Sequence, residues 1–190
     1  MRIAYADPPY PGMAHLYKDH PDYGGEVDHA ALIEKLYCDY DGFILHTAST
    51  TLDHVLSLIE FDVRIAAWVK PFASWKKNVY PAYAWEPVLF HGGRNAFGSR
   101  QTCRDFIAEP ITLKRGLTGA KPEAVCHWCF DLLGMEPDDE LDDLFPGSGA
   151  VGRAWESYRS TPRIEFPVEP EVDELPLVAA LSAGEEREGK

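Results

Sequence analysis

The chain has 190 residues, 45% of them hydrophobic, which suits one domain with a sizeable core. Its formal net charge of −13 excludes indiscriminate binding to nucleic acid, because phosphate contacts need cations. No stretch resembles a signal peptide or reaches the length of a membrane span, so we expect a cytoplasmic protein without membrane contact.

The first predicted element is a short, mostly apolar strand at residues 2–6, which runs directly into Asp7-Pro8-Pro9-Tyr10. Two prolines cannot continue a strand ladder, so the chain turns there. Open α/β sheets bind ligands just beyond the carboxyl ends of their strands. The Asp7 and Pro8 carbonyls and the flat face of Tyr10 suit a planar group with an exocyclic amine, such as adenine or cytosine. An ordinary Asp-Pro turn with Tyr10 in the core is the alternative.

Residues 11–26 lack periodicity and are rich in turn formers. A loop of this length beside a ligand-binding turn is more often functional than idle. We interpret it as a lid over the substrate, with candidate contacts at His15, Tyr17, Lys18, His20 and Tyr23.

Strands and helices then alternate. Asp28 is a candidate N-cap for a helix whose apolar positions are Ala31, Leu32, Lys35 (through its stem) and Leu36. A strand at 43–47, a helix at 50–59 and a strand at 63–69 follow. This alternation predicts an α/β sheet with right-handed parallel crossovers.

The middle of the chain is basic although the whole is acidic. The segment from Arg64 to Arg115 contains nine basic residues and three acidic ones. Residues 70–84 interleave cations with aromatics, a mixture that can hold phosphates and stack unpaired bases, and a strand follows at 86–90. A surface loop packed by its aromatics is the alternative. The candidate substrate contacts are Lys70, Trp75, Lys76, Lys77, Arg94 and Arg100.

A helix is predicted over 122–134, and it carries a pair of cysteines with the spacing of half a zinc site. Cys126, Cys129, Phe130 and Leu133 fall on one apolar stripe of that helix. We therefore predict core packing for both cysteines, and no metal.

Residues 140–155 have the pattern of a strand, a glycine-rich turn and a helix. Gly147 and Gly149 permit backbone angles and close ligand approach that a Cβ would block, and Gly152 is expected to allow tight contact between helix and sheet. No lysine follows the glycines, so the turn is not a P-loop. A glycine-rich turn that binds nothing is the alternative.

Together these motifs resemble those of amino-group DNA methyltransferases. Asp7-Pro8-Pro9-Tyr10 resembles the catalytic motif, residues 143–149 (Asp-Leu-Phe-Pro-Gly-Ser-Gly) resemble the S-adenosylmethionine motif, and residues 118–123 resemble the Lys-Pro segment before the cofactor strand. The order, with the catalytic motif first, is similar to the permuted, beta-type classes. Asp at the first motif position usually accompanies N6-adenine methylation.

The resemblance implies a Rossmann-like S-adenosylmethionine-dependent methyltransferase sheet, circularly permuted, with both motifs on neighbouring strands. The implied catalytic residues are Asp7, Pro8, Pro9 and Tyr10. The implied cofactor-binding residues are Ala6, Asp7, Lys121, Pro122, Asp143, Leu144, Phe145, Gly147, Ser148 and Gly149. The implied activity is methylation of adenine N6 in DNA by direct transfer to an extruded or unpaired base.

Several alternatives remain open: the same chemistry on RNA or on cytosine N4, methylation of a small molecule, and a subunit that works only as a homodimer or beside a partner. From Thr161 the chain is dense in Pro and Glu, which predicts an irregular or disordered tail. We expect a methyltransferase domain at 1–160 and a tail at 161–190, with the sheet truncated after the cofactor helix.

Overall fold

The structure is a computed structural model that describes residues 1–18, 24–71, 79–95, 102–111 and 120–162. Its helices and strands belong to one unit, Met1–Asn95 with Cys103–Pro162. In chain order the elements are β1 (Arg2–Ala6), the 3-10 helix η1 (Ala14–Tyr17), α1 (His29–Asp39), β2 (Gly42–His46), α2 (Leu52–Ser57), β3 (Arg64–Val69), β4 (Trp85–Gly92), β5 (Phe106–Ala108), α3 (Glu123–Leu132), β6 (Glu140–Asp143) and α4 (Ala150–Ser160). No helix within the described part of the chain combines the length and apolarity needed to cross a bilayer.

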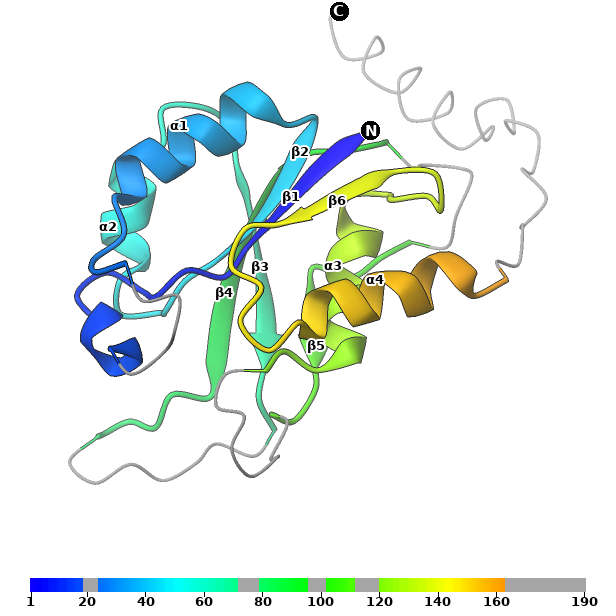
Figure 1. The fold of residues 1–190 in the computed structure, drawn as a ribbon. Helices are drawn as coiled ribbons and strands as arrows, with labels where there is room; N and C mark the ends of the chain where they lie inside the picture. Colours follow the sequence, from blue (N-terminus) through cyan, green and yellow to red (C-terminus); the bar gives the residue numbers. More distant parts are fainter. Residues whose placement is uncertain (19–23, 72–78, 96–101, 112–119, 163–190) are drawn as a thin grey trace, which may run out of the picture. The chain divides into compact units, whose positions relative to one another are not determined.

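The strands form one mixed sheet in the order β5-β3-β4-β2-β1-β6 (Figure 1). β1 pairs in parallel with β2 and β6, and β3 pairs in parallel with β5. β4 lies between β2 and β3 and is antiparallel to both. The predicted alternation of strands and helices is confirmed, but β3 is not the neighbour of β2. A strand's own sequence does not encode the direction of its neighbours, so the insertion of β4 was not predicted.

Helices cover both faces of the sheet. In Figure 1, α1 and α2 lie on one face and α3 and α4 on the other. Two hydrophobic clusters correspond to these faces: Ala4, Phe43 and Leu45 pack with α1 and α2, and Ile3, Tyr5 and Ile44 pack with α3 and α4. Successive strand residues point to opposite faces, so the near-continuous apolar runs of β1 and β2 serve both clusters.

The predicted start of α1 is confirmed. The Asp28 carboxylate accepts a hydrogen bond of 3.0 Å from the backbone N–H of Ala31, as an N-cap does. The buried face differs from the prediction. Ala31 and Lys35 are exposed, and the buried positions are His29, Leu32, Ile33 and Leu36. The spacing of four that joins Ala31 to Lys35 belongs to the solvent face of the helix.

The core position of the paired cysteines is also confirmed. Cys126, Cys129, Phe130 and Leu133 are all fully buried. Burial raises the pKa of Cys126 to about 12 and that of Cys129 well above its ordinary value. Metals are held by thiolates, so two thiols kept protonated in an apolar core pack as small hydrophobic groups.

The glycine-rich turn after β6 has the predicted backbone. Gly147 and Gly149 have φ of +43° and +68°, a region that L-residues with a Cβ rarely adopt. Gly152 corrects the prediction. It is exposed on α4, and a Cβ added there would meet no atom within 4 Å, so it does not mediate helix–sheet contact.

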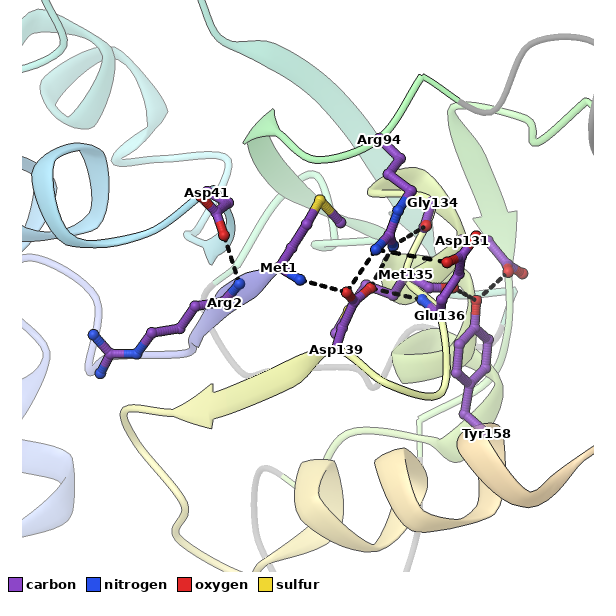
Figure 2. A network of polar contacts seen from close by, with 10 residues as sticks. All are labelled: Met1, Arg2, Asp41, Arg94, Asp131, Gly134, Met135, Glu136, Asp139 and Tyr158. Atoms are coloured by element: carbon purple, nitrogen blue, oxygen red, sulfur yellow. Dashed lines mark hydrogen bonds and ion pairs between the residues drawn. The ribbon is translucent and has the colours of Figure 1, made fainter.

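A buried carboxylate connects several chain segments at the edge of the sheet where β1 and β6 begin (Figure 2). The Asp139 side chain is 1% exposed, and it accepts from both Arg94 Nη atoms, at 2.5 and 2.8 Å, and from the Met1 amine at 2.6 Å. Burial acts to raise the pKa of Asp139, but these donors outweigh it, and the pKa is lowered. Asp139 thereby anchors the chain after β4 and the starts of two strands.

Candidate active site at the carboxyl edge of the sheet

The two motif-bearing turns leave the sheet from neighbouring strands. Tyr5 of β1 is the register partner of Asp143 of β6, and the Leu144 N–H donates to the Tyr5 carbonyl at 3.0 Å. Because the strands are parallel, Asp7 and the glycine turn follow them at the same edge (Figure 1). The predicted adjacency of the two strands is confirmed.

A buried cation sits beneath the first turn. Lys121 precedes α3, and its Nζ lies 3.1 Å from Asp7 Oδ1 and 2.5 Å from Glu86 Oε1. Burial acts to lower the pKa of Lys121, but Asp7 and Glu86 outweigh it and raise the pKa well above its ordinary value. Lys121 is therefore a permanent ammonium that fixes one oxygen of Asp7.

Glu86 is the other end of this ion pair. β4 runs antiparallel to β2, so Glu86 at its start lies at the edge where β1 and β2 end. Its second oxygen accepts from Lys70 Nζ at 2.8 Å. The Tyr10 hydroxyl lies close enough for Glu86 to contribute to raising the pKa of Tyr10, after burial as the main cause. Burial acts to raise the pKa of Glu86, but Lys121, His46 and Lys70 outweigh it and hold the pKa well below its usual range.

His46, at the end of β2, forms a hydrogen bond with Glu86. Its Nδ1 lies 2.8 Å from Glu86 Oε1, and its Nε2 lies 2.7 Å from the Tyr5 hydroxyl. Burial, together with Lys121, lowers the pKa of His46, so the ring is neutral at pH 7. A carboxylate only accepts, so Nδ1 carries the proton and Nε2 accepts from Tyr5.

Asp7, His46 and Glu86 each offer a ligand atom within 4.8 Å of the others, which is the geometry of a possible cation site. The Lys121 ammonium lies among them and contacts both carboxylates. A divalent ion would have to displace a buried, paired lysine. We therefore infer that the Lys121 ammonium occupies the position that a metal ion would take.

Asp143 has a different environment. Its Oδ1 accepts from the Phe145 N–H at 3.3 Å, whereas its Oδ2 is buried and has no hydrogen-bond partner among the described residues. Burial is the main cause that raises the pKa of Asp143 to about 6. A buried carboxylate oxygen without a partner is costly, and it suits a cationic N–H donor from a ligand.

The structure brings some predicted substrate contacts to this edge and not others. Lys70 lies there, bonded to Glu86, and Tyr17 of the predicted lid is close enough for Asp7 to contribute to raising its pKa, after burial as the main cause. Arg94 is a correction: it follows β4 at the opposite edge, where Gly92 pairs with Gly42 and Asp139 occupies the guanidinium. Outside the described residues lie Trp75, Lys76, Lys77, Arg100, His20 and Tyr23.

Sequence reasoning missed Glu86 and His46. Neither belongs to a recognised motif, but each is a polar residue attached to an apolar strand: Glu86 precedes Pro-Val-Leu-Phe, and His46 follows Phe-Ile-Leu. Charged residues are almost never fully buried unless they are paired. A glutamate inside a strand as apolar as β4 was therefore a signal for a buried partner.

Comparison with known proteins identifies the fold class. A crystal structure of M1.HpyAVI in complex with SAM aligns with a TM-score of 0.55 at 17% identity, covering 83% of this chain and 78% of that chain. A crystal structure of M1.HpyAVI alone aligns with a TM-score of 0.51 at 16% identity, over 83% and 76% of the two chains. No family profile and no curated protein matches the sequence. The chain therefore shares the mixed α/β fold of M1.HpyAVI.

Proposed function

We propose that the chain transfers a methyl group from S-adenosylmethionine to the exocyclic N6 amine of adenine in DNA. The observation that carries this proposal is the pairing of Tyr5 with Asp143, which sets the Asp-Pro-Pro-Tyr turn beside the glycine turn. Support also comes from M1.HpyAVI, which shares the fold and was solved with SAM. The order of the motifs favours the permuted, beta-type class.

The residues around Asp143 fit the cofactor. Its unpaired Oδ2 suits the ammonium of the methionine portion, and the backbone of Gly147 and Gly149 is free of Cβ atoms where that portion would lie. When bound, the cofactor supplies a methyl group activated on a sulfonium, so no covalent enzyme intermediate is required. By resemblance, Ala6, Pro122, Leu144, Phe145 and Ser148 would line the same site.

The Asp-Pro-Pro-Tyr turn would hold the target base. An aromatic amine is a poor nucleophile because its lone pair is delocalised into the ring. Hydrogen bonds from the amine to Asp7 and to the Pro8 carbonyl favour a pyramidal nitrogen, which frees that lone pair. Lys121 holds Asp7 Oδ1, so we assign Oδ2 to the amine. Pro9 fixes the turn, and Tyr10 stacks on the base.

We propose DNA as the substrate because a cation lies at this edge and exposed aromatics lead into the strand that begins there. Lys70 lies there, and after it come Tyr80, Tyr83 and Trp85, which are 99%, 49% and 40% exposed. Exposed rings beside a cation are the elements that hold unpaired bases and phosphates. Trp75, Lys76, Lys77 and Arg100 belong to the same proposal through the sequence alone.

A requirement for a second chain is a further proposal. β6 pairs with β1 on one side, and no described strand lies on its other side. An edge strand can accept another strand. Size-exclusion chromatography with light scattering tests this. A dimer, or an inactive monomer that gains activity with a second chain, supports it, whereas an active monomer refutes it.

The activity is tested by incubation with radiolabelled S-adenosylmethionine and single-stranded DNA, duplex DNA and RNA, followed by nucleoside identification. Label in N6-methyldeoxyadenosine is the expected result. Label in N4-methylcytosine or in RNA would correct the base or the substrate. Label in no nucleic acid would overturn the proposal.

A further inference from the structure

The Glu86 carboxylate lies beside both functional parts of the Asp-Pro-Pro-Tyr turn. Through Lys121 it reaches Asp7: the distances are 2.5 Å from Glu86 to Lys121 and 3.1 Å from Lys121 to Asp7. The Tyr10 hydroxyl also lies near Glu86, which contributes to raising the pKa of Tyr10 after burial as the main cause. One buried side chain, 6% exposed, is thus connected through Lys121 to the carboxylate that would bind the amine, and it lies near the hydroxyl of the ring that would stack on the base.

Glu86 is itself held in one orientation. His46 donates to Oε1 at 2.8 Å, and Lys70 donates to Oε2 at 2.8 Å. The His46 ring is fixed in turn by the Tyr5 hydroxyl. Each carboxylate oxygen therefore has a donor, and the carboxylate cannot rotate without breaking the buried hydrogen bond to His46.

This arrangement exceeds what stability alone requires. Buried ion pairs are often no more stabilising than well-packed apolar side chains of similar volume. Here the two carboxylates of Glu86 and Asp7 share the Lys121 cation, and Lys70 adds a second cation, so the four charges cancel. The result is a neutral cluster directly under the turn, as preorganisation of a polar site requires.

We propose that Glu86 is a positioning residue that couples Asp7 and Tyr10, so that the amine acceptor and the stacking ring are set by one carboxylate. The inference rests on the proposed methyl transfer. Misplacement of a reacting group by about 1 Å costs about 100-fold in rate. Glu86→Gln retains the shape but removes the charge that orients Lys121. It should lower kcat about 100-fold and change the cofactor Kd less than about 3-fold, because Asp143 lies outside the cluster.

Tyr10→Phe removes only the hydroxyl that lies near Glu86 and leaves the ring. If the two residues act as one unit, the Glu86→Gln/Tyr10→Phe double variant loses less activity than the product of the two single losses. Multiplicative losses would contradict the coupling. Glu156→Gln on α4 is the matched control, because Glu156 is exposed and is 3.7 Å from Arg159 only in a surface ion pair. It should retain wild-type kcat.

A measurement independent of activity separates this inference from the proposed function. In protein labelled with 13C at tyrosine Cζ, Glu86→Gln should shift the Tyr10 and Tyr5 resonances and leave that of Tyr158, which bonds Asp131, unchanged. An unshifted Tyr10 resonance, or wild-type kcat in Glu86→Gln, overturns the inference and leaves the methyltransferase proposal intact. A wild-type protein that methylates no nucleic acid overturns the proposed function itself.

Discussion

Tyr5 and Asp143 are register partners on adjacent parallel strands, although they lie 138 positions apart in the sequence, β1 being the first described strand in chain order and β6 the last. This pairing makes one edge of the sheet carry two acidic residues in contrasting environments. Asp7 is paired with a buried ammonium, whereas Asp143 has a buried oxygen without a partner among the described residues. The first arrangement suits an acceptor held in place, and the second suits a binding site for a cation.

The environment of Asp143 predicts pH-dependent cofactor binding. Because burial raises its pKa to about 6, the carboxylate that would bind an ammonium is lost as the pH falls through that value. The affinity of the wild type for S-adenosylmethionine should fall by up to about tenfold per pH unit below 6. Calorimetric titration between pH 5 and 8 measures it. Asp143→Asn should bind weakly across the whole range, and a variant with wild-type affinity would contradict this role.

The same carboxylate should cost stability in the ligand-free protein. The pKa of Asp143 in the folded state is above its unfolded value, so its ionisation disfavours folding, and stability falls as the pH rises from about 4 to about 6. Asp143→Asn should therefore raise the Tm at pH 7.5 and leave it nearly unchanged at pH 4. Differential scanning calorimetry of the wild type and Asp143→Asn at both pH values measures this difference in Tm. An equal change at the two pH values would exclude an electrostatic cause.

Arg94 should be structural and not a nucleic-acid contact. Arg94→Gln leaves the buried Asp139 with fewer donors and should lower the free energy of unfolding by about 1–3 kcal/mol at pH 7. Since the pKa of Asp139 is lowered in the folded state, the stabilisation is present above about pH 4 and lost as the pH falls further. Denaturant titration measures the difference.

DNA affinity provides the second readout for Arg94. Arg94→Gln should bind DNA with the wild-type salt dependence, whereas loss of a phosphate contact would lower the salt slope by about 1. Arg159→Gln is the matched control on α4. Its exposed ion pair with Glu156 should contribute less than about 1 kcal/mol. Weaker DNA binding by Arg94→Gln alone would restore Arg94 as a substrate contact.

Gly152→Ala should stabilise the protein. Gly152 is an exposed position within α4 with space for a Cβ, and Gly to Ala in a helix interior gains about 0.5–1 kcal/mol. Gly149→Ala is the contrasting change, because its φ of +68° is unfavourable for alanine and its Cβ would lie 3.1 Å from Arg153 Nη1. Thermal unfolding of both variants distinguishes them. A loss of stability in Gly152→Ala would show that the helix needs a glycine there.

Local signals accounted for the elements that sequence alone could predict. The Asp28 cap, the apolar strands and the cysteine stripe each depend on residues close in sequence. They can therefore be recognised without knowing which elements pack against them. The antiparallel insertion of β4 depends on which strands it contacts, and no local pattern records that. The prediction that Gly152 allows close helix–sheet contact was wrong for the same reason, because the sequence does not show which side of a helix a glycine occupies.

The residues of the candidate site also fall into those with a local sequence signal and those without one. Asp7 and Asp143 could be predicted as site residues because each lies in a contiguous motif. Glu86 and His46 reach Asp7 only through the folded arrangement of β2, β4 and Lys121. Arg94 was assigned to the wrong edge because charge density was counted along the chain, whereas the antiparallel direction of β4 carries its carboxyl end away from Asp7.

The central claim is that Asp7 acts on the substrate while the neighbouring strand holds the cofactor. The direct measurement is single-turnover methyl transfer to adenine N6 by Asp7→Asn, with the S-adenosylmethionine Kd determined on the same preparation. We predict a rate reduced by about 100- to 1,000-fold and a cofactor Kd within about 3-fold of wild type. A variant that methylates adenine at the wild-type rate would contradict the account.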